Sequence, residues 1–371
     1  MRLRRAILEE LELPLRAPFV TSFGRESRRR VLFVTLEERG GEEGIGECVA
    51  ARAPLYSSET TWTAREMIER HFLKDLRSLA TPTPGRFLAA SSRWRGHRMA
   101  RAAVEMALWD LSARLRGHSL ARTLGGTLHR VEVGVSVGIQ PGIAALRRAV
   151  ERYVTAGYGR VKLKVQPEWD ARPVAAIRRA FPTARLWVDA NQAYARGSIP
   201  RLVKWAHRER VEQMEQPFPE RDLSAHAALI ERARFRVCLD ESVVDSASLE
   251  DAIARRALTS LNVKPGRVGG HSHSIALARR AVAAGIPTWV GGMLETGVGR
   301  AHAVALASRK EFTLPADLSA SDRYYRTDLI DPPFVLGPGS TLEVPRSPGL
   351  GVAVDERRWA RARRRRTVVP L

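Results

Sequence analysis

From residue 131 onward, short runs of buried-strand residues alternate with amphipathic helical stretches. The strand-like runs are VEVGVSVGI, GRVKLKV, RLWVDAN, VEQMEQPF, FRVCLDES, SLNVKPG, PTWVGGML and FTLPADLS. Helix-like stretches such as GIAALRRAVERYVTAG and HSIALARRAVAAG lie between most of them. Eight strands alternating with helices indicate an α/β fold, either a (β/α) barrel or a doubly wound parallel sheet.

The spacing of the residues that end these runs separates the two folds. Six of them are 25, 26, 25, 24 and 28 residues apart in turn: Lys164, Asp189, Glu215, Asp240, Lys264 and Gly292. Each interval is about one β/α unit, because a barrel of ~250 residues divides into eight. The C-terminal ends of barrel strands converge on one mouth, where active sites are built, whereas an open sheet spreads them along a line. The pattern favours a barrel of the (β/α)7β type.

The first ~125 residues have a different pattern, with alternating segments followed by helical ones. RRAILEELELPL and RRVLFVTLEERGGEEGIGECVA predict antiparallel strands with a turn at GGEEG. ETTWTAREMIERHFL and MARAAVEMALWDLSARLRG predict helices, the second ending at Gly117. We therefore predict an α+β capping domain over residues 1–127, the barrel over 128–318, and a segment over 319–371 that returns to the cap and carries a basic tail.

Arginine supplies nearly all of the positive charge. The chain has 61 Lys+Arg against 40 Asp+Glu, a net charge of +21, yet only six of the cations are lysines. The arginines are spread through every segment without a zinc-finger, zipper or RNA-binding motif, so nucleic-acid binding is not predicted as the main function. The charge can still attract an anionic substrate. The one concentrated stretch, RRWARARRRR at residues 357–366, is predicted to be a flexible or surface segment.

The sequence also bears on location. No run approaches the ~18–20 apolar residues that a membrane span needs. The N-terminal MRLRRAILEELELPLR meets acids within its first ten residues and lacks the apolar centre of a signal peptide. Cys48 and Cys238 lie far apart without metal-type spacing, as in proteins of a reducing compartment. We expect a cytoplasmic protein.

Asp189, Glu215 and Asp240 end three consecutive strand-like runs. Three carboxylates that converge in one barrel mouth repel one another unless a cation lies among them. Mg²⁺ fits best, with Mn²⁺ as a substitute, because it takes a few carboxylates and keeps positions for water and substrate. The alternative is that each acid separately caps the following helix or pairs with an arginine. Their matched positions in three successive runs favour the metal.

Lysine is rare here, but three of the six lysines fall in the predicted barrel mouth. Lys162 and Lys164 are two residues apart on one strand and therefore point to the same face. Lys264 lies four units along the barrel and so across the mouth. Arginine cannot act as a general base, whereas a buried lysine beside other cations can, because both effects lower its pKa. The alternative is a set of lysines that only form salt bridges with the acids.

The K-x-K strand, the Asp–Glu–Asp series and the facing lysine resemble the enolase superfamily, muconate lactonising enzyme subgroup. Further stretches are similar to the family of o-succinylbenzoate synthases and N-acylamino acid racemases: APFVTSFG, GECVA, PLYSSE, MARAAVEMALWDL, VGVSVGI, GGMLETGVGRA and FTLPADLSASDRYY. The resemblance covers essentially the whole chain, except that the basic tail after Arg357 matches nothing expected of the family.

The resemblance implies a role for each matched residue. Lys164 would remove the proton α to a carboxylate and then protonate the departing hydroxyl. Lys162 would lower the pKa of Lys164 and hold the carboxylate, and Lys264 would stabilise the enediolate or act as a second base. Asp189, Glu215 and Asp240 would bind Mg²⁺, supported by Asn191 and Glu241. The TSFG loop would close over the substrate, and the pocket would be lined by Tyr56, Ser136, Gly291, Gly292 and Met293.

The activity implied first is dehydration of 2-succinyl-6-hydroxy-2,4-cyclohexadiene-1-carboxylate to o-succinylbenzoate, a lyase step in menaquinone synthesis. Racemisation of N-acylamino acids, N-succinyl derivatives above all, is the alternative, because both reactions begin with the same proton abstraction. The sequence does not separate the two. A third hypothesis is a basic nucleic-acid-binding or scaffold protein without catalysis, which the intact lysines and acids argue against. Family members are often homo-oligomers, but no interface signature decides the oligomeric state.

Overall fold

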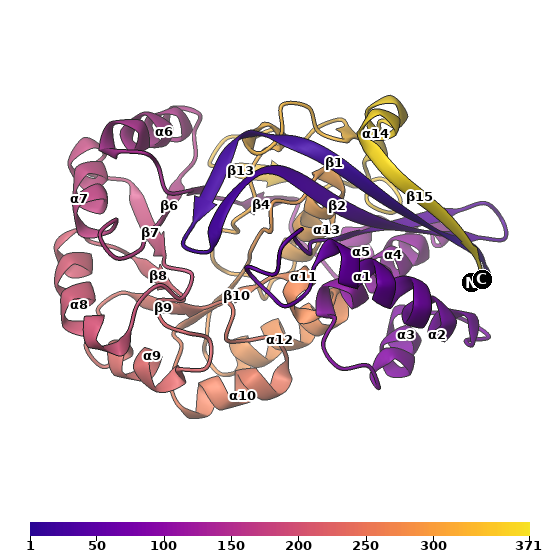
Figure 1. The fold of residues 1–371 in the computed structure, drawn as a ribbon, viewed down its shortest axis with the longest axis horizontal. Helices are drawn as coiled ribbons and strands as arrows, with labels where there is room; N and C mark the ends of the chain where they lie inside the picture. The colour runs from indigo at the N-terminus through magenta and orange to yellow at the C-terminus, as the bar shows by residue number, and fades with distance from the viewer.

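The computed structural model describes all 371 residues and has two packed parts, a barrel and a cap (Figure 1). The cap is built on an antiparallel sheet in the order β15-β1-β2-β3. Its strands are β1 (Leu3–Thr21), β2 (Gly24–Glu38), β3 (Glu43–Cys48) and β15 (Arg363–Pro370). The turn between β2 and β3 falls where GGEEG predicted it.

The cap sheet is a middle layer with two apolar faces. Val31 and Phe33 of β2 belong to the core cluster shared with the barrel, whereas Leu32 and Val34 belong to a separate cluster under the cap helices. This division follows from the two-residue period of a strand. The cap helices are α1 (Thr61–Met67), the π-helical turn η1 (Ile68–Phe72), α2 (Leu73–Arg77), α3 (Pro84–Ser91), α4 (Arg98–Leu115) and α5 (Leu120–Thr123).

The two helical stretches predicted in the cap are present. One becomes the continuous run α1–η1–α2, and its N-terminus is capped by Thr60, whose side chain accepts from the Thr63 amide at 3.1 Å. The other becomes α4, after which Gly117 adopts φ +64°. Glycine tolerates this left-handed conformation without the strain that a Cβ brings, which is why the helix ends there.

The barrel is a parallel seven-stranded sheet in the order β11-β10-β9-β8-β7-β6-β5, with helices outside it (Figure 1). Its strands are β5 (Val135–Val137), β6 (Arg160–Lys164), β7 (Arg185–Asp189), β8 (Gln213–Glu215), β9 (Arg236–Leu239), β10 (Ser260–Val263) and β11 (Thr288–Val290). The intervening helices are α6 (Ile143–Thr155), α7 (Ala171–Ala180), η2 (Arg196–Ser198), α8 (Ile199–Arg208), α9 (Leu223–Ile230), α10 (Ser246–Ala254), α11 (Pro265–Val268), α12 (His271–Ala283) and α13 (Gly297–Ala307).

The first and last predicted barrel strands differ from expectation. VEVGVSVGI is divided at Gly134 into β4 (Arg130–Glu132), which pairs with β13 (Thr341–Glu343), and β5, which pairs with β6. FTLPADLS forms no regular strand, because Pro315 has no amide to donate. It still closes the barrel through single bridges from Phe312 to Thr288 and from Ala316 to Val133.

The C-terminal segment runs back to the cap. It contains η3 (Ser321–Arg323), β12 (Ile330–Asp331), β14 (Ala353–Val354) and α14 (Glu356–Ala362), and it ends in β15. The basic stretch predicted as a flexible or surface segment, residues 357–366, lies at the surface and is regular in structure. It spans most of α14 and the start of β15, an edge strand that pairs antiparallel with β1. None of the helices in the structure has the length and apolar character needed to cross a membrane.

Candidate active site

The strand ends at the barrel mouth bring the predicted site residues together. Lys164, Asp189 and Glu215 are lateral neighbours, because Lys164 pairs in register with Asp189 and Asp189 with Glu215. Asp240 directly follows β9, and Lys264 directly follows β10. All five side chains are buried. They lie beneath a cavity of about 590 Å³ whose other wall is formed by cap residues, among them Phe19, Phe23, Tyr56 and Met99.

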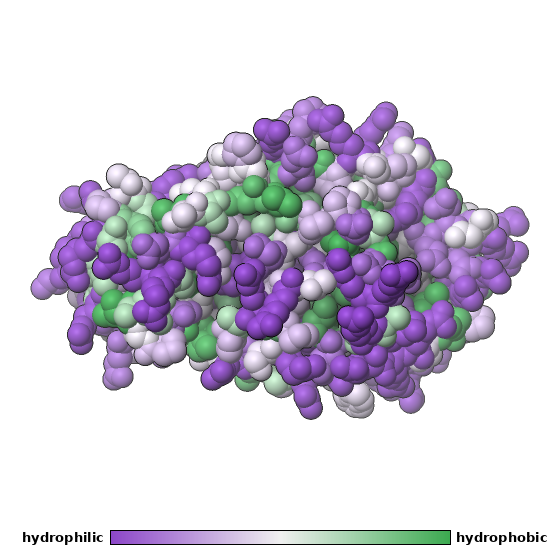
Figure 2. Space-filling view, turned by 90° about the horizontal axis from the view of Figure 1, so that it is seen from above, coloured by the Kyte–Doolittle hydropathy of each residue, from purple (hydrophilic) through white to green (hydrophobic).

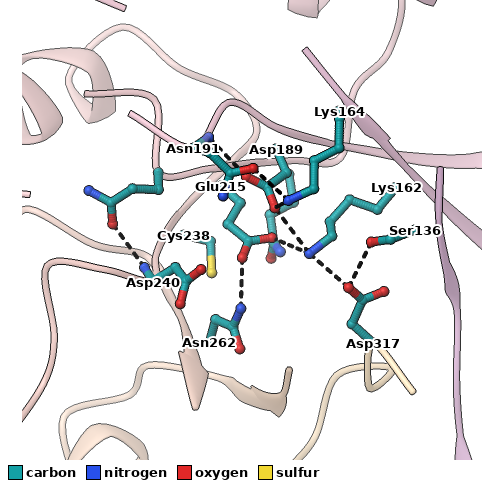
Figure 3. A network of polar contacts seen from close by, with 12 residues as sticks. Ser136, Lys162, Lys164, Asp189, Asn191, Glu215, Cys238, Asp240, Asn262 and Asp317 are labelled. Carbon is teal, nitrogen blue, oxygen red and sulfur yellow. Dashed lines mark hydrogen bonds and ion pairs between the residues drawn. The ribbon is translucent and has the colours of Figure 1, made fainter. Parts of the chain in front are cut away.

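The two lysines of strand β6 both point into the barrel, at different depths. Lys164 Nζ donates to Asp189 Oδ2 and to Asn191 Oδ1, each at 2.6 Å. Lys162 Nζ lies deeper and contacts three carboxylates (Figure 3): Glu215 at 2.6 Å, Asp317 at 2.9 Å and Asp189 at 3.3 Å. The outward-facing Val161 and Leu163 belong to the apolar core. The alternation of β6 thus places both lysines in the mouth while the strand stays packed.

The opposite wall carries Lys264, whose Nζ donates to Asp240 Oδ2 at 2.6 Å. Tyr56, from the cap, donates its hydroxyl to the other oxygen of Asp240 at 3.0 Å and lies 3.4 Å from the lysine nitrogen. Arg267, from α11, also forms an ion pair with Asp240. The cap therefore completes this wall through Tyr56.

The carboxylates control the charge of two of the lysines. Burial alone lowers the pKa of Lys162, but the charges of Asp317, Glu215 and Asp189 outweigh it and raise the pKa. In the same way, burial lowers the pKa of Lys264, and Asp240 raises it well above its ordinary value. From the sequence we expected burial and neighbouring cations to lower the pKa values of buried lysines in the mouth. The direction is opposite because each ammonium group touches a carboxylate directly.

The acids are turned toward these cations, so the structure contains no ready group of three metal-ligating side chains. The donor set nevertheless fits a hard divalent cation. Burial, followed by the charge of Asp189, raises the pKa of Glu215, and burial, followed by Asp240, raises that of Glu241. Glu241 also has a buried carboxylate oxygen, Oε2, without a hydrogen-bond partner. Burial thus disfavours the charged forms of Glu215 and Glu241, a cost that a bound cation would relieve, and carboxylate oxygens are the ligands that Mg²⁺ selects.

The predicted supporting and pocket residues divide into those that face the cavity and those that do not. Asn191 bridges the site, accepting from Lys164 and donating to Glu241 Oε1 at 3.1 Å. The cavity is lined by Ser136, Gly292, Met293, Tyr56 and the hairpin-turn residues Thr21, Phe23 and Gly24. Gly291 does not line it. A Cβ there would lie 2.1 Å from Asn262 Oδ1, so this glycine allows close packing inside the barrel.

The hairpin turn between β1 and β2 reaches the barrel mouth. Ser22 Oγ donates to the Asn191 carbonyl at 3.0 Å, and the Val20 carbonyl accepts from the Ile139 amide at 2.9 Å. These contacts hold the TSFG stretch over the strand ends, which is the position that the sequence reasoning expected for a loop closing over a substrate.

Sequence reasoning missed several charged or polar residues at the site. Asp317 forms an ion pair with Lys162 at 2.9 Å and accepts a hydrogen bond from Ser136 Oγ at 2.7 Å (Figure 3). It also accepts from Arg160 Nη1 at 2.9 Å. Arg160 is fully buried, with its guanidinium carbon 4.5 Å from the Trp187 ring centre. A signal for Arg160 existed, since it precedes Lys162 by two residues and shares its face. Asn262, which donates to Glu215 at 2.7 Å, likewise precedes Lys264 by two residues.

Comparison with known proteins agrees with this geometry. Residues 4–125 match the mandelate racemase/muconate lactonizing enzyme N-terminal domain, and residues 145–358 match the enolase C-terminal domain-like family. An N-succinylamino acid racemase from Amycolatopsis sp is 44% identical, covering 95% of both chains. An o-succinylbenzoate synthase from Geobacillus stearothermophilus is 41% identical, covering 96% of this chain and 94% of that protein.

A solved structure of an enolase-superfamily member from Listeria innocua superposes with a TM-score of 0.94 at 37% identity, covering 100% of this chain and 99% of that one. Both domain matches, the identities above 40% and the near-complete coverage lead to the same assignment. The chain belongs to the enolase superfamily, with the two-domain organisation of the mandelate racemase/muconate lactonizing enzymes.

Proposed function

We propose that this enzyme removes the proton α to a carboxylate of a small anionic substrate. The observation that carries the proposal is the pair of buried lysines on opposite walls of one cavity, Lys164 at the end of β6 and Lys264 directly after β10. A proton α to a carboxylate is weakly acidic, so its removal needs a positioned base and a site that stabilises the negative charge formed on the carboxylate. The cavity offers both.

Lys164 is assigned as the base. It is the lysine nearer the cavity on β6, and its side chain is 9% exposed, compared with 2% for Lys162. After taking the α-proton, Lys164 returns it to a hydroxyl leaving on the same face, so that a syn elimination needs only one residue. Lys162 keeps a fixed positive charge beneath the substrate carboxylate, and Lys264 stabilises the enediolate from the other side.

Asp189, Glu215 and Asp240 are assigned as Mg²⁺ ligands, with Asn191 and Glu241 supporting them and Mn²⁺ as a substitute ion. When bound, the ion would draw charge from the substrate carboxylate and take over the carboxylate charge that now raises the pKa of Lys162 and Lys264. The three acids are held in place by their strand ends and by Asn262, Tyr56 and Arg267, so their positions do not depend on the lysines alone.

The reaction we assign is dehydration of 2-succinyl-6-hydroxy-2,4-cyclohexadiene-1-carboxylate to o-succinylbenzoate. The hydrogen at C1 and the hydroxyl at C6 leave as water, and the ring becomes aromatic. Relatives named o-succinylbenzoate synthase are 35–41% identical to this chain. The cavity suits such a substrate, because it combines the lysines with apolar side chains such as Phe19, Phe23, Leu55, Met293 and Leu294.

N-succinylamino acid racemisation is the second candidate. Two relatives with that name, at 44% and 42% identity, come from Amycolatopsis and Thermus thermophilus. A racemase must remove a proton from one face and return it on the other, so it needs two bases, and the structure places a lysine on each side. The two reactions share the first step and the same residues.

One experiment separates these candidates. Purified protein is incubated with Mg²⁺ and the cyclohexadiene substrate while the loss of diene absorbance is followed, and N-succinyl amino acids are tested in parallel by polarimetry. Metal-dependent turnover of the diene supports the synthase. Racemisation without dehydration assigns the enzyme to amino-acid metabolism, and activity on neither substrate contradicts both assignments. Exchange of the α-proton with D₂O then shows whether the lysines act as bases at all.

A further inference from the structure

The arginine-rich tail has no role in the proposed reaction, and its placement raises a separate question. Strand β15 is the edge strand of the cap sheet and carries four consecutive exposed arginines, residues 363–366. Arg363 and Arg366 approach Glu9 at 3.0 and 3.7 Å. Arg364 and Arg365 have no carboxylate partner and instead line a cleft.

This cleft, which we call the arginine cleft, has a volume of about 460 Å³. It lies between β15, the central cap strands and the start of α1, and it is separate from the catalytic lysines and acids. Its lining residues are Glu10, Arg30, Arg52, Thr61, Trp62, Arg364 and Arg365. Hydrophilic residues dominate the surface of the molecule on the face seen in Figure 2, with apolar patches between them.

The charges in the arginine cleft are unbalanced. Its only acid, Glu10, is already shared between Arg65 at 3.3 Å and Arg30 at 3.8 Å. Arg52, Arg364 and Arg365 form no ion pair. Burial first and the charge of Arg365 second lower the pKa of Arg65 behind the cleft. Guanidinium groups that outnumber the one carboxylate between them repel one another, and a bound anion would relieve this repulsion.

The arginine content of the chain does not by itself explain this arrangement, since many other surface arginines are matched with acids. Arg280 pairs with Glu250 at 2.5 Å and Arg255 with Asp251 at 2.7 Å, both at exposed positions. The arginine cleft stands out because several arginines without partners share one concave surface.

Trp62 adds an aromatic surface to the same cleft. Its side chain is 71% exposed, whereas every other tryptophan of the chain is buried or half-buried. A single exposed apolar residue is ordinary at a protein surface, but this indole faces a cleft that is otherwise lined mainly by arginines. Arginines that bind phosphate oxygens in pairs, next to an indole on which a base can stack, form a recognised combination for nucleotides.

We propose that the arginine cleft binds a nucleoside polyphosphate, with Arg364, Arg365 and Arg52 on the phosphates and Trp62 against the base. The volume is that of a site for one small ligand rather than of a long groove that follows a polymer. Arg52 lines both this cleft and the catalytic cavity, but binding here does not require the reaction proposed above.

The test is a titration of the full-length protein with ATP, without Mg²⁺, at fixed ionic strength, followed by tryptophan fluorescence and by calorimetry. The double variant Arg364→Ala/Arg365→Ala is compared with Arg357→Ala/Arg361→Ala. The control arginines are exposed residues of the same tail that lie outside the cleft and make no ion pair. Both variants lose two positive charges from the total of +21, so non-specific attraction falls equally. We expect ATP to bind at least about 10-fold more weakly to the cleft variant and within about twofold of wild type to the control.

Trp62→Leu tests the stacking contact. It should weaken ATP binding while leaving inorganic tripolyphosphate unchanged, because the latter has no base to stack. Equal losses in the two arginine variants, or ATP binding that neither variant affects, would overturn the proposal in favour of general charge or of the larger cavity. Much tighter binding of a single-stranded oligonucleotide than of ATP would overturn it in favour of nucleic acid. Thermal unfolding of each variant confirms that all of them are folded.

Discussion

Two groups of buried carboxylates in this molecule are stabilised in opposite ways. In the barrel mouth, Asp240 and Asp317 face cations, and their pKa values are lowered because lysine and arginine charges outweigh the effect of burial. At the seam between cap and barrel, Glu47 of β3 and Glu105 of α4 face mainly uncharged donors. There burial dominates, raising the pKa of Glu47 to about 7 and that of Glu105 above its ordinary value.

The seam carboxylates cap barrel helices from the cap side. Glu47 accepts from the Thr296 amide at 3.1 Å, the Thr296 hydroxyl at 2.6 Å and the Gly299 amide at 2.9 Å, at the start of α13. Glu105 accepts from the His271 and Ser272 amides, each at 2.9 Å, at the start of α12. A carboxylate is favoured at a helix N-terminus by the free amides and the helix dipole. The acids of the seam thus join two parts of the fold, whereas those of the mouth neutralise buried cations.

The largest expected effect is on catalysis, where the mouth needs lysine and not merely positive charge. Lys164→Arg keeps the charge near Asp189 and Asn191 but removes the group that can give up its proton. We expect turnover of the cyclohexadiene substrate to fall by about 10²–10⁴-fold, with little change in thermal unfolding. The measurement is steady-state turnover with Mg²⁺. An active Lys164→Arg enzyme would contradict the assignment of Lys164 as the base.

The second effect is on stability at the mouth. Asp317→Asn leaves the buried charges of Arg160 and Lys162 without their shared partner, which costs about 3–5 kcal/mol in the free energy of unfolding. The matched control is Asp322→Asn. Its ion pair with Arg16, at 3.5 Å, is exposed on both sides, so we expect a change of at most about 1 kcal/mol. Urea unfolding of the three proteins gives both values, and similar values for the two variants would show that Asp317 is not needed as a counter-charge.

Asp317 is a residue of the candidate site that we did not predict from the sequence. The lysines and acids of β6 to β10 could be placed together, because regular β/α units repeat about every 25 residues and their strand ends share one mouth. The period does reach Asp317, which lies 25 residues after Gly292 in the eighth predicted run, although the segment around Pro315 is not a regular strand. The sequence did not show that Asp317 pairs with Lys162. Gly291 was predicted to line the pocket but packs against Asn262 instead. The pairing of β15 with β1 joins the two ends of the chain, and no local pattern predicts such a contact.

The third effect is a pH dependence of the free energy of unfolding that we expect from Glu47 at the seam. The pKa of Glu47 is about 7 in the folded protein, compared with an ordinary value of 4.5, so the folded state holds a proton that the unfolded state releases. Between these two values the free energy of unfolding therefore falls as the pH rises, by up to about 3 kcal/mol. Glu47→Gln cannot release this proton, and it should gain stability relative to wild type from pH 5 to pH 7 and no more above that. Urea unfolding at four pH values tests this, since contributions shared by both proteins cancel. A constant difference would mean that Glu47 is ionised throughout.

The smallest expected effect is the loss of stability when one serine hydroxyl that donates to a buried acid is removed. Each region offers one such serine. Ser272 Oγ donates to Glu105 at 2.6 Å, and Ser136 Oγ donates to Asp317 at 2.7 Å. Glu105 depends on uncharged donors, so losing one in Ser272→Ala should lower the free energy of unfolding by about 1–2 kcal/mol. Asp317 keeps Arg160 and Lys162 after Ser136→Ala, and we expect a loss below about 1 kcal/mol. Both serines are replaced by the same residue, so the difference between the two variants measures how far each carboxylate relies on neutral hydrogen bonds. A larger loss at Ser136 would reverse the comparison and show that cations alone do not satisfy a buried acid in the barrel mouth.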